Sequence, residues 1–179
     1  MVKTYSIHNQ DGCGSLANPV VFPKVDGANV ATAVFVFDRL NISSDVIVQN
    51  AFLKFVPAED STGDLVTYSI ALLYTSLEQV PCEDVTNVSY HELALPASWN
   101  ISGQWTKDVP VATVDIAKLI NFMIRKSTWK SDSPIQIILH PLTEEASAVT
   151  RRIKANLTEL VLNYEDRYAS MYNSRPVTI

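Results

Sequence analysis

The residue types that perform catalysis are few in this chain of 179 residues, and they lie far apart. The three histidines, His8, His91 and His140, show no paired spacing, and no His or Cys pattern typical of a metal site occurs. A Gly-x-Ser-x-Gly elbow and a glycine-rich phosphate loop are also missing, and the chain has only five glycines. The sequence therefore predicts a protein without enzymatic activity, cofactor or metal.

Acidic residues occur as sequence neighbours, whose side chains point to opposite sides of an extended chain. We expect them to be solvated turn residues rather than the separated acid–base pair of a glycosidase. The pairs are Glu59-Asp60, Glu83-Asp84, Glu144-Glu145 and Glu165-Asp166. The Asp60–Asp64 loop has hard oxygen ligands, so calcium binding stays open there, although its spacing matches no known calcium loop.

Two tryptophans stand six residues apart in the segment "SWNISGQWTKD" at 98–108. Exposed rings of Trp99 and Trp105 could stack on sugar rings and form a ligand platform. Tryptophan is more often largely buried, and corners between strands are common places to bury it. Trp129 follows in the same region. Three tryptophan rings around the one short helix that the sequence predicts, at 116–125, are typical of packing. Packing is therefore favoured over a platform, and both interpretations are kept.

The composition is that of a globular domain with a lightly charged surface. Hydrophobic residues make up 47% of the chain and charged residues 18%, a balance often found in chains that pack against others. The net charge of −5 and the absence of a basic patch disfavour a nucleic-acid partner. No apolar run approaches the ~18 residues of a membrane span. The N-terminus lacks the apolar region of a signal peptide. Two free thiols are favoured for Cys13 and Cys82, although their pairing stays open.

Alternation of apolar and polar residues with period two dominates the sequence and predicts half-buried strands. Ile47 and Leu53 should face the core from the strand at 46–57, and Tyr164 should face it from the strand at 159–166. Gln136, in the strand at 134–141, should face solvent. The loop 58–64 carries Asp, Ser, Thr and Gly and predicts a hairpin. The strong strand segments are 31–38, 46–57, 65–76, 134–141 and 159–166, and weaker ones are 2–8, 109–115 and 148–154.

One segment breaks this period and predicts a short amphipathic helix over 116–125. Asp115 is its candidate N-cap, and Lys118, Asn121 and Arg125 can face water. Its apolar stripe, which we expect to face the core, is Ile116, Leu119, Ile120 and Met123.

Eight or more strands with one embedded helix predict an all-β fold, an antiparallel β-sandwich of jelly-roll type. We expect an N-terminal strand and arm at 1–30, the sandwich at 31–166 and a C-terminal extension at 167–179. The extension is not periodic, yet it carries apolar anchors that suit contact with a neighbouring subunit. These candidate assembly contacts are Tyr168, Met171, Tyr172, Val177 and Ile179.

The order of three segments resembles the DNRLRE-type jelly-roll modules over about 34–165. "AVFVFDRLNISSDVIVQNAFLKFVP" is similar to their opening, in which an x-Φ-x-F-D strand (Φ, apolar) leads through a short loop into a second strand. "SWNISGQWTKDVPVATVDIAKLINFMIRKSTWKSDSPIQIILHP" is similar to a later block with a W-N turn, a second Trp, a short helix and an aliphatic strand. "LTELVLNYED" is similar to the closing strand. The chain departs from the family at Val36, where a basic residue is usual, and at 150–156, which lacks the usual turn.

The resemblance implies a non-catalytic jelly-roll module, like those found in phage structural proteins and in carbohydrate-binding modules for acidic polysaccharides. A polyuronate ligand would require a basic groove, for which the candidates are Lys54, Arg151, Arg152 and Lys154.

We therefore expect a virion structural protein, a phage capsid decoration or cement protein or a head-fibre component. It would be made in the host cytoplasm and assemble with its own copies and with other virion proteins such as the major capsid protein. The alternative is a carbohydrate-binding module or adhesin domain that recognises a surface polysaccharide through Trp99 and Trp105. Neither expectation includes a nucleic-acid or membrane partner.

Overall fold

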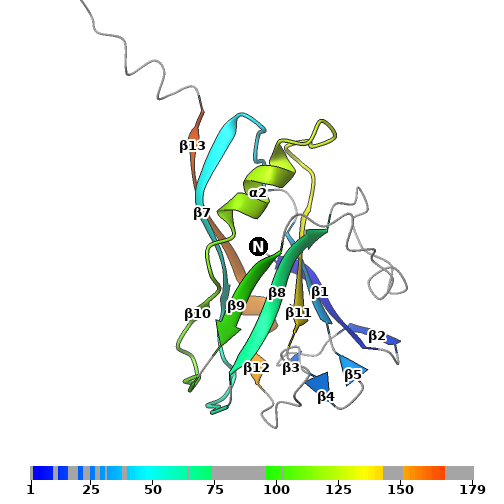
Figure 1. Cartoon of the computed structure of the whole chain (residues 1–179), viewed down its shortest axis with the longest axis vertical. Helices are drawn as coiled ribbons and strands as arrows, with labels where there is room; N and C mark the ends of the chain where they lie inside the picture. Colours follow the sequence, from blue (N-terminus) through cyan, green and yellow to red (C-terminus); the bar gives the residue numbers. More distant parts are fainter. Residues whose placement is uncertain are drawn as a thin grey trace, which may run out of the picture.

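The fold is an all-β sandwich of two antiparallel sheets with one α-helix in the part of the chain that is described (Figure 1). It is seen in a computed structural model. The described residues are 2–9, 12–15, 20–21, 25–26, 29–30, 32–37, 40–63, 65–73, 96–101, 103–142 and 151–167.

The larger sheet has six strands in the order β2-β1-β6-β11-β8-β9. Strand β1 belongs to the predicted N-terminal arm, yet it pairs with β6 inside this sheet. The central strands are buried on both faces, which corrects the prediction for Gln136, a fully buried rather than solvated residue. The strands are β1 (Val2–Asn9), β2 (Gly12–Ser15), β6 (Thr32–Phe37), β8 (Val66–Leu73), β9 (Ala97–Ile101) and β11 (Ile135–Pro141).

The smaller sheet has the order β10-β7-β13, so β7 is its central strand. It comprises β10 (Val111–Ala112), β7 (Val46–Phe55) and β13 (Glu159–Asp166). Two short ladders complete the described strands, β3 (Val20–Val21) with β12 (Arg152–Ile153) and β4 (Val25–Asp26) with β5 (Asn29–Val30). The 3-10 turn η2 (Ala155–Leu157) precedes β13.

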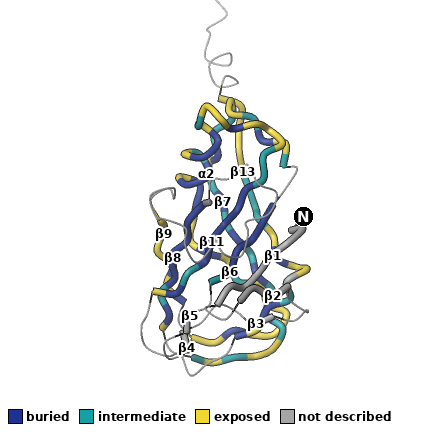
Figure 2. The backbone as a smooth tube through the Cα atoms, turned by 90° about the vertical axis from the view of Figure 1, so that its right-hand side faces the viewer, coloured by how far each residue is buried: buried dark blue, intermediate teal, exposed yellow. Residues whose placement is uncertain are grey.

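The core lies between the two sheets, and Figure 2 marks the buried residues along the backbone in dark blue. It consists of apolar side chains at alternate strand positions. Phe35 from the larger sheet meets Phe55 from the smaller one, with ring centroids 5.4 Å apart. Burying one such side chain fully stabilises the fold by about 1.5–3 kcal/mol. This interdigitation is the physical reason for the period-two pattern in the sequence.

The hairpin predicted for 58–64 is wrong, because β7 and β8 belong to different sheets and do not pair. The loop instead crosses from one sheet to the other. Its polar residues suit a crossing loop as well as a hairpin, so composition could not separate the two.

A β-bulge changes which residues of β7 face the core. Asn50 lies opposite Asn163, and Val48 lies opposite Tyr164, so Gln49 is the extra residue. In consequence Val48 is buried at 2% exposure, whereas Ile47, predicted to face the core, is only half-buried. Tyr164 is also predicted to face the core, but its side chain is 52% exposed.

Helix α2 (Ala117–Ile124) confirms the predicted amphipathic helix and its apolar stripe, which packs into the core. The N-cap position is Ile116 rather than Asp115. The Asp115 carboxylate still accepts the Ala117 N–H at 2.8 Å, so it stabilises the start of the helix from one residue further out. No helix within the described ranges is long and apolar enough to cross a membrane.

Side chains of the segment 113–121 close the edge of β7 that faces away from β13. The Asn121 amide bonds both backbone groups of Val48, accepting its N–H at 3.0 Å and donating to its carbonyl at 2.7 Å. The Asp115 carboxylate accepts the Ala51 N–H at 3.0 Å, and the Ile116 N–H donates to the Ala51 carbonyl at 2.8 Å.

The same edge continues at Leu53, whose N–H donates to the Thr113 hydroxyl at 3.0 Å. The Thr113 N–H in turn donates to the Leu53 carbonyl at 2.9 Å. Regular pairing is confined to β10, which is why the predicted strand 109–115 contains only two strand residues. Side chains therefore take the place of a strand along most of this edge.

Replacing Asn121 with Ala should remove both hydrogen bonds between helix α2 and Val48. The backbone N–H and carbonyl of Val48 would then lose the partners that the Asn121 amide provides. We expect the free energy of unfolding to fall by about 2 kcal/mol. The matched control is Asn163→Ala, because Asn163 is exposed and its side chain donates to the Asn50 side-chain oxygen at 2.6 Å rather than to a backbone group. Chemical denaturation of both variants checks this. Equal stability of the two variants would contradict the structural role of Asn121.

Candidate functional site

Trp99, one half of the predicted ligand platform, lies in the core between the two sheets. Its ring stacks on Phe55, with centroids 5.9 Å apart and an interplanar angle of 21°. Tyr68 lies 5.9 Å away on β8, in register with Trp99 on β9. Only 5% of Trp99 is exposed, so the ring faces protein rather than a sugar.

Trp105, the other half, joins two loops at the end of the sandwich remote from α2. Its backbone exchanges hydrogen bonds of 2.7 and 2.9 Å with Ser61, and its side chain is 3% exposed. The guanidinium of Arg151 lies over the ring, 5.4 Å from its centroid. Both tryptophans would have to leave the core before they could bind a ligand as a platform.

Arg151 is a buried cation at this loop end, with 3% of its surface exposed. It donates from Nη2 to the Gly103 carbonyl at 3.4 Å, and Nε has no hydrogen-bond partner within the described residues. Burial raises the pKa of nearby Tyr68, while the charge of Arg151 acts in the opposite direction. Tyr68 therefore stays neutral and serves packing.

The four cations proposed for a basic groove do not form one. Arg151 is buried, and each of the other three lies beside a carboxylate. Exposed pairs of this kind stabilise a fold little, but they cancel the local positive charge. The pairs are Lys54 with Glu159, Arg152 with Glu59 and Lys154 with Asp108. Through its hydrogen bond, Lys154 lowers the pKa of Asp108 below its usual value.

The Asp60–Asp64 loop, left open as a calcium site, is described only in part, because Asp64 lies outside the described residues. The Asp60 carboxylate accepts the Lys107 N–H at 2.7 Å and so ties the loop to the segment after Trp105. No group of three or more His, Cys, Asp or Glu side chains gathers within the described ranges. Cys82 also lies outside them, so its pairing with Cys13 stays open.

Of the three histidines, His140 is the one whose side-chain surroundings are described. It lies in β11 next to β6, and its Nδ1 is 2.8 Å from the hydroxyl of Thr32 on β6. Burial lowers the pKa of His140 below its usual value of 6.5, so the neutral ring is the form that the fold favours. His91 lies outside the described residues, and of His8 only the strand position is described.

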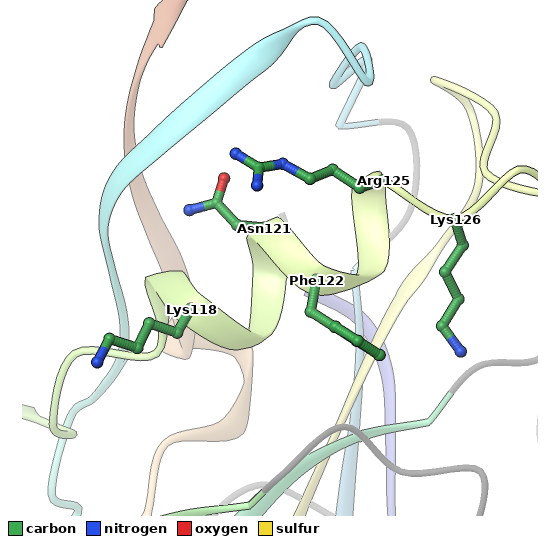
Figure 3. Close-up of a pocket in the computed structure, with 5 residues that line it drawn as sticks. All are labelled: Lys118, Asn121, Phe122, Arg125 and Lys126. Atoms are coloured by element: carbon green, nitrogen blue, oxygen red, sulfur yellow. The ribbon is translucent and has the colours of Figure 1, made fainter.

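A basic patch on α2 is the feature that the sequence pattern missed (Figure 3). Lys118, Asn121, Phe122, Arg125 and Lys126 line a pocket of about 540 Å³ on the outer side of the helix. Lys118 and Arg125 are exposed as predicted, whereas Asn121, also predicted to face water, is half-buried and bonds the Val48 backbone. Phe122 is an apolar residue, yet it lies 57% exposed beside them. A large exposed ring on the polar side of the helix was the signal available in the sequence.

Comparison with known proteins gives no family assignment. No family model matches the chain, and no curated protein is significantly similar to it. The resemblance to DNRLRE-type modules therefore stays a prediction. The candidate assembly contacts in the C-terminal extension lie outside the described residues: Tyr168, Met171, Tyr172, Val177 and Ile179.

Replacing Trp99 with Ala should lower the free energy of unfolding by about 3–5 kcal/mol, because it empties a well-packed part of the core. Phe122→Ala is the matched control, since it removes an exposed aromatic ring and should change stability by less than about 0.5 kcal/mol. Urea denaturation measures both. A Trp99→Ala variant that keeps full stability and loses binding to a glycan would restore the platform interpretation.

Protonation of His140 should destabilise the fold. Its pKa is lower in the folded chain than in the unfolded one, so stability is fully present above pH 6.5 and is lost as the pH falls through the folded value. The difference in unfolding free energy between wild type and His140→Gln should therefore shrink between pH 7 and pH 5. A difference that stays constant over this range would contradict the burial of a neutral ring.

Proposed function

We propose that this chain is a non-enzymatic virion structural protein, a phage capsid decoration or cement protein or a head-fibre component. Its partners are its own copies and other virion proteins such as the major capsid protein. Contacts form through the β13 side of the sandwich and the chain end that follows it. The observation that carries the proposal is the outer edge of β13.

The hydrogen-bond pattern of the smaller sheet determines in which direction the backbone N–H and C=O groups of β13 point. Val48, Ala51 and Leu53 direct their N–H and C=O groups away from β13, toward the segment 113–121. In an antiparallel ladder the residue opposite such a position also directs its groups outward. The residues opposite these three are Tyr164, Leu162 and Leu160.

No strand of the described part of the chain pairs with this outer edge of β13. An eight-residue strand with available backbone groups is a template for another chain, and native proteins cover such edges. Leu160 and Leu162 are half-buried against the core, so a pairing chain would extend an existing apolar layer. Assembly with a neighbour is one way to cover the edge.

The sequence after β13 supports the same proposal. Residues 167–179 carry tyrosine, methionine and aliphatic anchors at a spacing that suits neither a helix nor a flexible linker. This segment continues directly from the exposed strand. A neighbouring subunit offers these anchors an apolar surface to bind.

The carbohydrate-binding alternative has less support. It depends on Trp99 and Trp105, and both rings pack inside the protein. Three of the cations considered for a basic groove, Arg151, Arg152 and Lys154, are buried or paired with carboxylates.

Deleting 167–179 should abolish assembly and leave the sandwich folded. The loss would appear in the mass of the purified protein by light scattering and in its absence from particles, while the thermal midpoint stays close to that of wild type.

A full-length variant tests the anchors separately from chain length, with all five changed to Ser: Tyr168, Met171, Tyr172, Val177 and Ile179. It should fail to assemble just as the deletion does. Normal incorporation of the truncated chain into particles would contradict the proposal.

A further inference from the structure

The available backbone groups of β13 lie at every second residue along its outer edge. Leu160, Leu162 and Tyr164 direct their N–H and C=O groups outward, because the β7 residues opposite them direct theirs away from β13. The Arg167 N–H donates inward to the Asp45 carbonyl at 2.9 Å, which agrees with this alternation, since Arg167 stands an odd number of residues after Tyr164. A strand that adds to this edge must therefore bond at the three outward positions.

The place beside this edge is filled by another strand at the neighbouring end of the sheet. Beyond the end of β7, β12 takes the place of β13. The Ala58 N–H donates to the Arg152 carbonyl at 2.9 Å, and the Lys154 N–H donates to the Val56 carbonyl at 2.8 Å. Strand β3 pairs with the other edge of β12. Because β3 fills the place beyond Glu159, an added strand must enter from the other end of β13 and run antiparallel to it.

The segment "RPVTI" at 175–179 has the hydrogen-bonding pattern that this edge requires. Pro176 has no N–H, so in an edge strand it must stand where the N–H would point away from the sheet. Arg175, Val177 and Ile179 would then form the hydrogen bonds, and they alternate as the outward groups of β13 do.

The apolar pattern of the segment leads to the same alignment. Residues directly opposite each other in an antiparallel pair share one face of the sheet. Val177 and Ile179 would therefore lie on the face of Leu160 and Leu162, which pack against the core. A shift by one residue would place Thr178 on that face and the proline at a position that has to donate.

We propose that residues 175–179 of one copy add to β13 of a neighbouring copy as an antiparallel edge strand. The inference rests on the proposed assembly function and names the contact by which it takes place. In this antiparallel register both leucines of β13 receive an aliphatic partner, and the Tyr164 ring, which is 52% exposed, receives a cation. The paired residues are Ile179 with Leu160, Val177 with Leu162 and Arg175 with Tyr164.

A neighbouring copy also accounts for the residues between β13 and this segment. Residues 168–174 can span at most about 25 Å, which limits how far the two β13 strands can lie from each other. A return to the same copy's β13 would leave Tyr168, Met171 and Tyr172 in a hairpin loop beyond the sheet. Between two copies these side chains cross to an apolar surface of the neighbour.

Pairing of β13 with β13 of a second copy fits less well. With the two-fold axis at Leu162, the middle of the outward-directed residues, Glu159 would lie opposite Glu165 of the second copy at both ends. Like charges directly opposite each other destabilise a strand pair. The segment 175–179 has no acidic residue and avoids this repulsion.

Disulfide cross-linking tests the pairing and its register. Val161 and Thr178 would lie directly opposite each other as a pair without hydrogen bonds, with Cα atoms about 4.5 Å apart, which suits a disulfide. The full-length background carries Cys13→Ser and Cys82→Ser. A Val161→Cys chain mixed with a Thr178→Cys chain should form a covalent dimer of one copy each on oxidation. The matched control replaces Val161→Cys with Lys107→Cys, an exposed position beside Trp105, and should stay monomeric.

Equal cross-linking of the control would overturn the inference. The same holds for a disulfide that forms only when both cysteines are placed in one chain, because the segment would then return to its own β13.

Two substitutions in the otherwise wild-type chain test the alternation. Val177→Lys should weaken assembly about 30-fold, because it puts an ammonium group in place of a buried valine. Thr178→Lys puts the same group on the outer face and should change assembly by less than about threefold. Sedimentation equilibrium over a range of concentrations measures both. Equal weakening by the two changes would contradict the alternation and overturn the inference.

Failure of the inference and failure of the proposed function are distinguishable. Assembly that requires 167–179 but gives no cross-link between positions 161 and 178 would overturn the inference and leave the proposed function standing. Copies that cross-link in this register yet are absent from particles would refute the proposed function and leave the strand pairing standing.

Discussion

Strand β7 depends on side-chain hydrogen bonds for one of its two edges, and the rest of the sandwich depends on β7. The strand is the centre of the smaller sheet, and β13 covers only its other edge. Asn121, Asp115 and Thr113 satisfy its backbone groups where a strand would otherwise lie. The same bonds hold α2 against the sheet, and buried backbone groups without partners would cost about 1–3 kcal/mol each.

This arrangement gives the two ends of the molecule different roles. At one end Trp105, Arg151 and the loops around Ser61 and Asp60 are tied to one another, with the rings buried. At the other end α2 and β13 flank β7, and cations, carboxylates and two aromatic rings stay exposed. The first end stabilises the sandwich, and the second is where we propose that assembly takes place.

The sequence pattern predicted individual strands and the helix, but it could not predict which strands pair with each other. The strands, the helix and its buried stripe follow from periodicity, which reports which side chains face apolar surroundings. Periodicity does not report which strands pair, so the crossing loop 58–64 was predicted as a hairpin. It also cannot show a bulge, so Ile47 was predicted on the wrong face. Tyr164 shares the core-side face of Leu160 and Leu162, yet its side chain is 52% exposed. Asn121 and Tyr164 lie 43 positions apart in the sequence, and only the structure shows that both adjoin Val48 of β7. The jelly-roll connectivity and the family resemblance stay predictions.

Hydrogen exchange of individual amides, measured on the isolated and the assembled protein, tests the central claim that assembly covers the β13 side. The account predicts that the outward-directed amides of Leu160, Leu162 and Tyr164 exchange freely in isolation and become protected on assembly. Those of Val48, Ala51 and Leu53 should be protected in both states, because they already donate to side chains of 113–121. Unchanged exchange at β13, with new protection confined to the loop around Trp105, would contradict it.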